Sequence, residues 1–298
     1  MTQNKCCRHG ANLRRRRRRC RKILRSIIFS CSIIAAAVFV AVGSSMIRSG
    51  DGRTNKYDVE AGNNTYDNAV IENSKISEKN KIQNNQSMLD DIMNSTQYPK
   101  QLKDLALKNE EALEFVYDYP AEHVKEHTID LTEEASMDSV PLFVQWDKRW
   151  GYEKYSGNFF AASGCGPTTL SMVVVYLTHN REASPIAVAK YSKEAGYSVD
   201  GSGSSWTLIS EGCMHYGVKA KAVALDESRM KAELDEGHPI VVNVGPGDFT
   251  DTGHFMVITG YDDEGFSIND PNSIEKSGKR WLFRNISSQI RAVWSMYV

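Results

Sequence analysis

The pattern of apolar and polar positions divides the chain into a long uncharged segment near its start, a polar stretch, and a region where short helix and strand patterns alternate. Residues 26–47 hold no charged side chain. A helix of this length spans the roughly 30 Å hydrocarbon core of a bilayer. No amphipathic period marks one face for burial against protein. The segment predicts an uncleaved transmembrane anchor, with a cleaved signal peptide ending near Ala41-Val42-Gly43 as the alternative.

Charge is distributed unevenly along a chain whose formal net charge is −1. The first 50 residues hold 12 of the 36 Lys and Arg and none of the 37 Asp and Glu, and the arginine block 14–19 precedes the apolar segment. Basic residues stay on the cytoplasmic side of a membrane, which explains this position better than RNA binding does. Residues 1–25 are therefore predicted to be a cytoplasmic tail, with the chain after residue 48 extracellular, or secreted if the segment is cleaved. The acidic remainder argues against a nucleic-acid partner.

Two further regions precede the part that is rich in aromatic and β-branched residues. Residues 48–97 are polar, poor in aromatic side chains and rich in Asn, without a persistent period, which predicts a disordered stalk. Residues 98–139 form a helical lead-in. Within the lead-in, apolar residues recur near helical spacing between Pro99 and Pro120, which predicts a helix over 99–118 that packs on the main domain.

Residues 140–298 provide enough chain for one domain with its own core. The pattern predicts helices over 165–178, from Pro185 with Ser184 as N-cap, over 205–216, and from Asp226 to Gly237. Strands are predicted over 240–244, 254–261, 266–270 and 292–298. Helices followed by an antiparallel set of strands indicate an α+β fold.

The segment Ser163-Gly164-Cys165-Gly166-Pro167 places a thiol at or just before a helix N-terminus. Unpaired amides and the helix dipole stabilise negative charge there, so the thiolate of Cys165 is favoured. The flanking glycines let another chain approach the sulfur closely. Cys213, by contrast, lies among apolar neighbours and is predicted to pack in the core. A Cys165–Cys213 disulfide is the alternative for both.

A nucleophilic cysteine requires a base, and the base requires a partner that orients it. His254 begins a predicted buried strand after a flexible loop, so its ring is expected to project into a cleft. Asp270 ends the next predicted strand, sixteen residues later. Adjacent antiparallel strands would bring this carboxylate beside the imidazole.

With Gly-Cys-Gly-Pro, Gly-His-Phe and Asn-Asp-Pro in this order, residues 140–298 resemble the bacteriocin-processing (double-glycine leader) peptidase-like family of papain-like cysteine peptidases. The resemblance implies a papain-like fold, with helices packed on an antiparallel sheet. It implies Cys165 as nucleophile, His254 as general base and Asp270 as the orienting acid, and no cofactor. Transporter-linked members also carry several membrane spans and a nucleotide-binding motif, which this chain lacks, so export of a leader peptide is not implied.

The same resemblance implies an oxyanion-hole role for the side-chain amide of Gln145, in the segment that begins Val140-Pro141. Gln145 lies 20 residues before Cys165, farther than in papain, so residues 148–163 must fold back for the amide to reach the sulfur.

Other residues have less specific patterns. Gly164 beside the thiol, Gly253 beside His254, and Trp206 after a glycine-serine loop are predicted to contact substrate, with core burial as the alternative for Trp206. Residues 262–265 predict a hairpin turn, with Ca²⁺ binding as the alternative. A zinc site made by Cys165, His254 and Asp270 ranks below the peptidase, because no second His is placed to complete it.

These features predict a membrane-anchored extracellular cysteine peptidase that acts on peptides or cell-wall peptides. The alternatives are a catalytically inactive papain-like domain that binds such peptides and a transacylase that uses the same triad.

Overall fold

The computed structural model describes residues 64–298. The chain divides into two units, 1–67 and 68–298, and the second holds nearly every element described here. The predicted cytoplasmic tail and transmembrane anchor lie outside the described residues. Among residues 64–298, no helix is both long enough and apolar enough to cross a bilayer.

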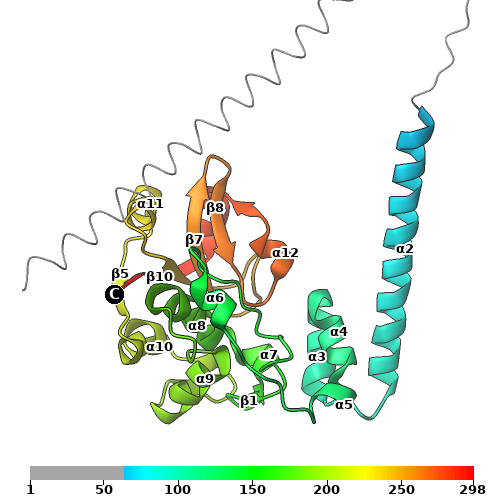
Figure 1. Cartoon of the computed structure of the whole chain (residues 1–298), viewed down its shortest axis with the longest axis horizontal. Coiled ribbons are helices and arrows are strands. Elements are labelled where there is room, and N and C mark those ends of the chain that lie inside the picture. Colours follow the sequence, from blue (N-terminus) through cyan, green and yellow to red (C-terminus); the bar gives the residue numbers. More distant parts are fainter. Residues whose placement is uncertain (1–63) are drawn as a thin grey trace, which may run out of the picture. The chain divides into compact units, whose positions relative to one another are not determined.

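A six-stranded antiparallel sheet is the central element of the second unit (Figure 1). β7 and β8 form a tight hairpin in which Asp262 pairs with Gly265, so the predicted turn is confirmed. β6 and β7 are joined by the longer loop 245–253. Across the sheet the strands run β5 (Lys219–Ala222), β10 (Ile290–Tyr297), β6 (Ile240–Val244), β7 (His254–Asp262), β8 (Gly265–Asn269) and β9 (Arg280–Trp281).

Both faces of the sheet are covered, because side chains alternate along each strand. Val241 and Val257 belong to the core that includes α8 (Cys165–Thr178) and α9 (Pro185–Glu194). Val242 belongs to a second core with Met230 of α11 (Glu227–Asp235). β6 is therefore buried along its whole length, which explains why its five residues are almost all apolar.

The predicted helices of the main domain are largely confirmed. Ser184 and Asp226 cap α9 and α11 by accepting a backbone N–H three residues on. The helix predicted over 205–216 is instead split into α10 (Thr207–Ser210) and the 3₁₀ helix η2 (Gly212–Tyr216), because the backbone at Glu211 leaves helical geometry.

The short elements were not predicted. They comprise β1 (Lys154–Tyr155), β2 (Asn158–Phe159), α7 (Phe160–Ser163), β3 (Ser198–Val199), β4 (Gly203–Ser204), α12 (Ile274–Ser277), β9, α13 (Phe283–Ile286) and η3 (Ser287–Gln289). The four-residue strand β5 was not predicted either. Strands of two residues are too short for a period to appear in the sequence.

The lead-in is helical, but it does not form one helix over 99–118. Asn109 adopts extended backbone angles, and its side chain accepts the N–H of Glu111 to start a new turn. This break separates α3 from the helices that follow, and apolar residues from both sides of it join Phe159 in a third core. The lead-in comprises α3 (Lys100–Lys108), η1 (Glu110–Ala112), α4 (Leu113–Tyr117), α5 (Tyr119–Glu122) and α6 (Thr132–Ser136).

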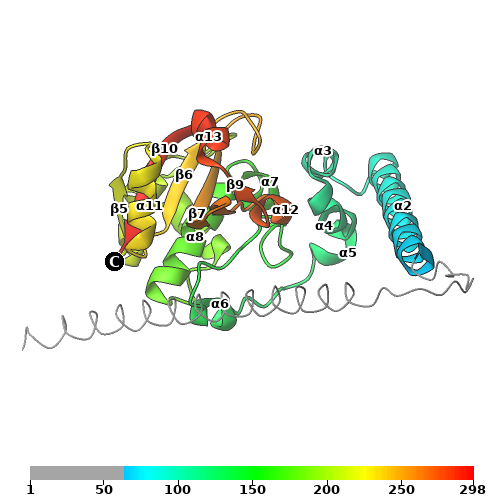
Figure 2. The same cartoon turned by 90° about the horizontal axis from the view of Figure 1, so that it is seen from above.

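The prediction of a disordered stalk over 48–97 is wrong for α2 (Asn64–Asn94), a 31-residue helix (Figure 2). No Gly or Pro interrupts this segment. At its end, Met88, Leu89 and Ile92 pack into the third core, and Asn85 donates to Glu110 at 2.7 Å. This tertiary packing stabilises a helix that the sequence pattern alone does not predict.

Candidate active site

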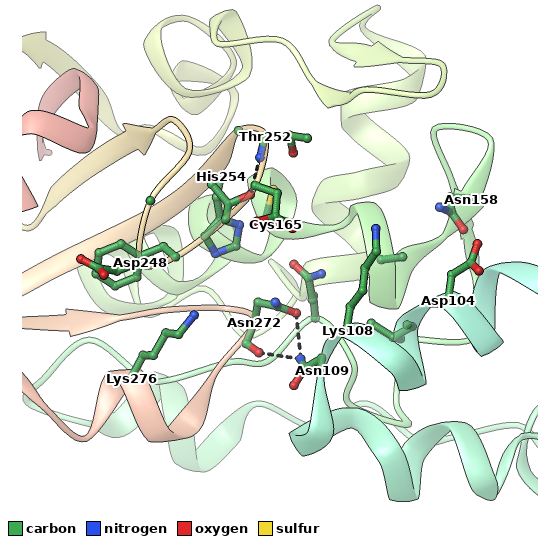
Figure 3. A pocket seen from close by; sticks show the side chains of 18 of the residues that line it. Asp104, Lys108, Asn109, Asn158, Cys165, Asp248, Thr252, His254, Asn272 and Lys276 are labelled. Atoms are coloured by element: carbon green, nitrogen blue, oxygen red, sulfur yellow. Dashed lines mark hydrogen bonds between the residues drawn. The ribbon is translucent and has the colours of Figure 1, made fainter. Parts of the chain in front are cut away.

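Cys165 is the first residue of α8, the most completely buried helix of the main domain. The backbone N–H groups of Gly166 and Phe255 and the ring of His254 lie close enough to its sulfur to stabilise negative charge there. Figure 3 shows the thiol directly beside that ring, at the edge of a cavity. The helix N-terminus and the two amides favour the thiolate form, as the sequence predicts.

His254 lies between the thiol and a carboxylate. Its Nε2 is 2.7 Å from Oδ1 of Asp270, and both side chains are buried. Because Nε2 is committed to Asp270, Nδ1 is the ring nitrogen that remains for Cys165. The structure therefore brings together the three residues that the sequence places 89 and 16 positions apart.

Opposing effects set the pKa values of this pair. Burial alone would raise the pKa of the Cys165 thiol, but the hydrogen bond and charge of His254, with the two backbone N–H groups, bring it below its usual range. Burial would lower the pKa of His254, but the Asp270 carboxylate and Cys165 raise it to about 10. Both directions favour a thiolate beside an imidazolium near neutral pH.

Gln145 lines the same cavity as Cys165 and His254. The hairpin β1–β2 and α7 fold the intervening chain back, as its 20-residue separation from Cys165 requires. The Gln145 Nε2 donates to the Ala161 carbonyl at 2.7 Å, which leaves its second N–H without a bond partner among the described residues. The Oε1 is buried without a partner there as well. The Gln145 side chain is thus held in place by one hydrogen bond, while its second N–H and its Oε1 remain without partners among the described residues.

Two cavities meet at Cys165. The first, of about 480 Å³, is lined by Gln145, His254 and residues of the lead-in. The second, of about 670 Å³, is lined by glycine-rich segments, Arg291 and Trp206. Both cavities share Asn158, Cys165 and Gly253. Cys165 therefore borders both cavities.

The three residues predicted to contact substrate have different surroundings. Gly253 is exposed, with no atom within 4 Å of where a Cβ would be. Trp206 is 47% exposed and packs edge-on against Trp294. It is therefore not buried in the core, which was the alternative for this residue. Gly164 is buried, and a Cβ there would lie 2.6 Å from the Phe160 ring. Gly164 lines neither cavity, so its role is close packing under the nucleophile.

The structure does not contain the two alternatives that the sequence offers for Cys165, a disulfide with Cys213 and a zinc site with His254 and Asp270. Cys165 and Cys213 are free thiols, and Cys213 is fully buried, which raises its pKa to about 11. Because the His254 ring lies between thiol and carboxylate, the three groups do not converge on one point. Among residues 64–298, no group of three His, Cys, Asp or Glu side chains is arranged to hold a metal.

Several residues of the site were missed by the sequence interpretation. The lead-in residues Asp104, Lys108 and Asn109 line the first cavity (Figure 3). Asn272 donates its backbone N–H to Oδ1 of Asp270 at 2.8 Å. The one available signal was the polar run Lys108-Asn109-Glu110-Glu111, which interrupts the apolar period in the middle of the predicted helix.

Comparison with known proteins gives a family for the larger part of the chain. Residues 137–298 match the Peptidase_C39 like family. The peptidase domain of Streptococcus ComA, a bifunctional ABC transporter involved in quorum sensing, is 19% identical with a TM-score of 0.38, covering 53% of this chain and 96% of that one. A protein from Bacillus anthracis described as a C39-like peptidase is 18% identical with a TM-score of 0.34, covering 53% and 95%. No curated protein matches the chain.

The matched residues are those that build the sheet, α8 and the cavity edge around Cys165. The chain therefore belongs to the Peptidase_C39 like family.

Proposed function

We propose that this protein is a cysteine peptidase with Cys165 as nucleophile, His254 as general base and acid, and Asp270 as the group that orients the imidazole. The observation that carries the proposal is the position of the His254 ring, bonded to Asp270 through Nε2 and to the thiol on its other side. An imidazole held in this way exchanges protons with the sulfur in one fixed orientation.

The reaction begins with the thiolate–imidazolium pair. The sulfur attacks the carbonyl carbon of the scissile amide, so a C–S bond forms and the carbonyl oxygen becomes an oxyanion. His254 then donates its proton to the amide nitrogen, the C–N bond breaks, and the amine leaves. His254 next removes a proton from water, which attacks the thioester and releases the carboxylic acid and Cys165.

The oxyanion requires donors that are in place before the reaction. The backbone N–H of Cys165 at the start of α8 and the free N–H of Gln145 are the proposed pair. The Ala161 carbonyl supports this role because it fixes the Gln145 amide beside the cavity. A peptide that crosses the sulfur would occupy both cavities, with Gly253 and Trp206 among its contacts.

The location belongs to the proposal as well. The uncharged residues 26–47 and the preceding arginine block support a single-pass anchor with the peptidase domain outside the cell, where cell-wall peptides are available. Protease protection of the full-length chain in sealed cells tests this part. Digestion of the domain from outside is expected, and complete protection would contradict it.

The catalytic proposal is tested with the full-length chain and a peptide library. We expect hydrolysis products from the wild type that disappear in Cys165→Ala. A peptidyl chloromethyl ketone should label Cys165 rapidly, and His254→Ala should slow this labelling. Slow labelling that does not depend on His254, with no products, would indicate a binding domain. Amide products in the presence of an added amine would indicate a transacylase.

A further inference from the structure

The loop that carries Asp270 is held by residues from outside the family domain. We infer that Asn109 and Glu111, in the lead-in, are positioning residues that hold Asp270 against His254, so that the active site extends beyond residues 137–298. This inference rests on the proposed function, because it concerns the orienting carboxylate of the same triad.

Asn109 binds both the backbone and the side chain of Asn272, in the loop that carries Asp270. Its Nδ2 donates to the carbonyl oxygen of Asn272 at 2.9 Å and to the Asn272 Oδ1 at 3.1 Å (Figure 3). Asn272 in turn donates its N–H to Oδ1 of Asp270 at 2.8 Å, the same oxygen that receives His254. Asn109 is thus two hydrogen bonds away from the carboxylate that orients the base.

Glu111 holds the other end of the loop. One carboxylate oxygen accepts the hydroxyl of Ser273, and the other accepts the backbone N–H groups of Ile274 at 2.7 Å and Glu275 at 3.1 Å. These bonds to a charged acceptor are stronger than neutral ones. They fix the start of α12, directly after the segment that carries Asp270 and Asn272.

The Asp270 carboxylate has few hydrogen bonds of its own. Its Oδ1 receives His254 and the Asn272 N–H, but its Oδ2 is buried without a hydrogen-bond partner among the described residues. The orientation of the carboxylate therefore depends on where the loop backbone is held. Within the family domain, the Gln145 N–H donates to the Pro271 carbonyl at 2.7 Å, and Trp146 donates to the Asn272 carbonyl at 3.2 Å. The Asp270 backbone is also held from within the family domain, because its N–H donates to the Ser277 Oγ at 2.9 Å and its carbonyl accepts the Ser273 N–H at 3.2 Å. The lead-in adds the contacts of Asn109 with Asn272 and of Glu111 with the residues that follow it.

The same lead-in segment also lines the cavity beside the reacting atoms. Leu105, Lys108 and Asn109 line the cavity that Cys165 and His254 also line. One short segment, on either side of the helix break at Asn109, therefore forms a wall of the cavity and anchors the acid loop. A segment that served only to join the domain to the preceding chain would need neither contact.

The test compares two alkylating agents on the folded, full-length chain. Iodoacetate is an anion and reacts preferentially while His254 carries its positive charge, whereas iodoacetamide is neutral. The ratio of their rates at Cys165, followed by peptide mass spectrometry across pH, reports the charge on His254 and cancels differences in access. We expect the pH at which this ratio falls to decrease by about one unit in Asn109→Ala and in Glu111→Ala, and by more in the double variant.

The matched control is Glu110→Ala, which removes a neighbouring carboxylate that contacts Asn85 and not the acid loop. It should leave the ratio as in the wild type. Glu111→Gln keeps an acceptor oxygen for the backbone N–H groups, so the pH at which its ratio falls should lie close to the wild-type value. Thermal unfolding identifies any variant that does not fold.

Two failures are distinguishable. If Asp270→Ala moves the ratio but Asn109→Ala and the double variant do not, the lead-in does not position the acid and the inference is overturned. If the wild-type ratio shows no dependence on His254 or Asp270, the triad itself is wrong, and the inference falls with the proposed function.

Discussion

The Nε2 of His254 lies 2.7 Å from Oδ1 of Asp270, although sixteen positions separate the two residues in the sequence. His254 starts β7, and Asp270 directly follows β8, so the antiparallel pairing of these strands brings both residues to the open end of the hairpin. Cys165, at the start of α8, meets the ring there. The predictions below follow from this arrangement.

Replacement of Cys165 by Ala should reduce peptide hydrolysis by about 10⁴-fold or more, because no other group at this position can form the acyl intermediate. Cys213→Ala is the matched control. The Cys213 thiol is buried and its pKa is raised to about 11, so it stays protonated and unreactive. We expect Cys213→Ala to retain activity and to lose about 1 kcal/mol of stability. Equal product patterns from wild type and Cys165→Ala would reject this nucleophile.

The activity should have a broad pH range. The acid limb reports loss of the thiolate and should lie below the usual range of a cysteine, because His254 and two amides lower the pKa of Cys165. The alkaline limb reports loss of the imidazolium proton, at about 10. Asp270→Asn removes the charge that raises the pKa of His254, so the alkaline limb should move to lower pH by more than about one unit. A limb that stays in place would show that Asp270 does not act on His254.

Gln145→Ala should lower kcat by about 10²–10³-fold, the usual effect of losing one oxyanion donor. KM should change little, because the interaction develops only in the transition state. Steady-state kinetics on one peptide substrate measure both values. A rise in KM with kcat preserved would instead assign Gln145 to ground-state binding.

Two glycines next to the reacting residues should respond differently to Ala. At Gly164 a Cβ would lie 2.6 Å from the Phe160 ring, so Gly164→Ala should cost about 1–3 kcal/mol of stability. Around Gly253 the space is open, so Gly253→Ala should unfold at the wild-type temperature while altering KM. Thermal unfolding beside kinetics checks both, and equal stability of the two variants would contradict the packing described here.

Trp206→Ala should weaken binding of substrates that extend into the second cavity. The side chain is 47% exposed and lines that cavity, so its loss should raise KM by roughly tenfold, or about 1.4 kcal/mol, with kcat and stability nearly unchanged. Peptides shortened from each end in turn identify the side affected. If no truncation removes the difference between variant and wild type, Trp206 does not contact substrate.

The sequence predicted the parts of the structure that have a local signal. The helix after Cys165, the capping residues Ser184 and Asp226, and the strand 240–244 are found as expected, because each depends on a period or a cap within a few residues. The helical state of Asn64–Asn94 was missed because its stabilisation comes from apolar contacts at its end with a distant part of the chain.

The candidate site shows the same division. The motifs predicted that Cys165, His254 and Asp270 lie together, and the resemblance added Gln145; the structure brings Cys165, His254 and Asp270 together and places Gln145 in the wall of the same cavity. The contacts of Asn109 with Asn272 join residues 163 positions apart, and no spacing or composition rule specifies such a pair. Gly164 was assigned to substrate binding because a glycine is permissive in many ways, and only the position of the Phe160 ring distinguishes packing from access.

The placement of α8 has a consequence for how this protein loses function. Every residue from Gly166 to Val175 is buried, so the helix that carries Cys165 is held by the core of the domain. The Asp270 carboxylate, in contrast, is on the short connection between β8 and α12, which is held mainly by hydrogen bonds. Denaturant should therefore abolish turnover at concentrations well below those of the cooperative unfolding transition. The first group to be displaced should be the Asp270 carboxylate and not the Cys165 thiol.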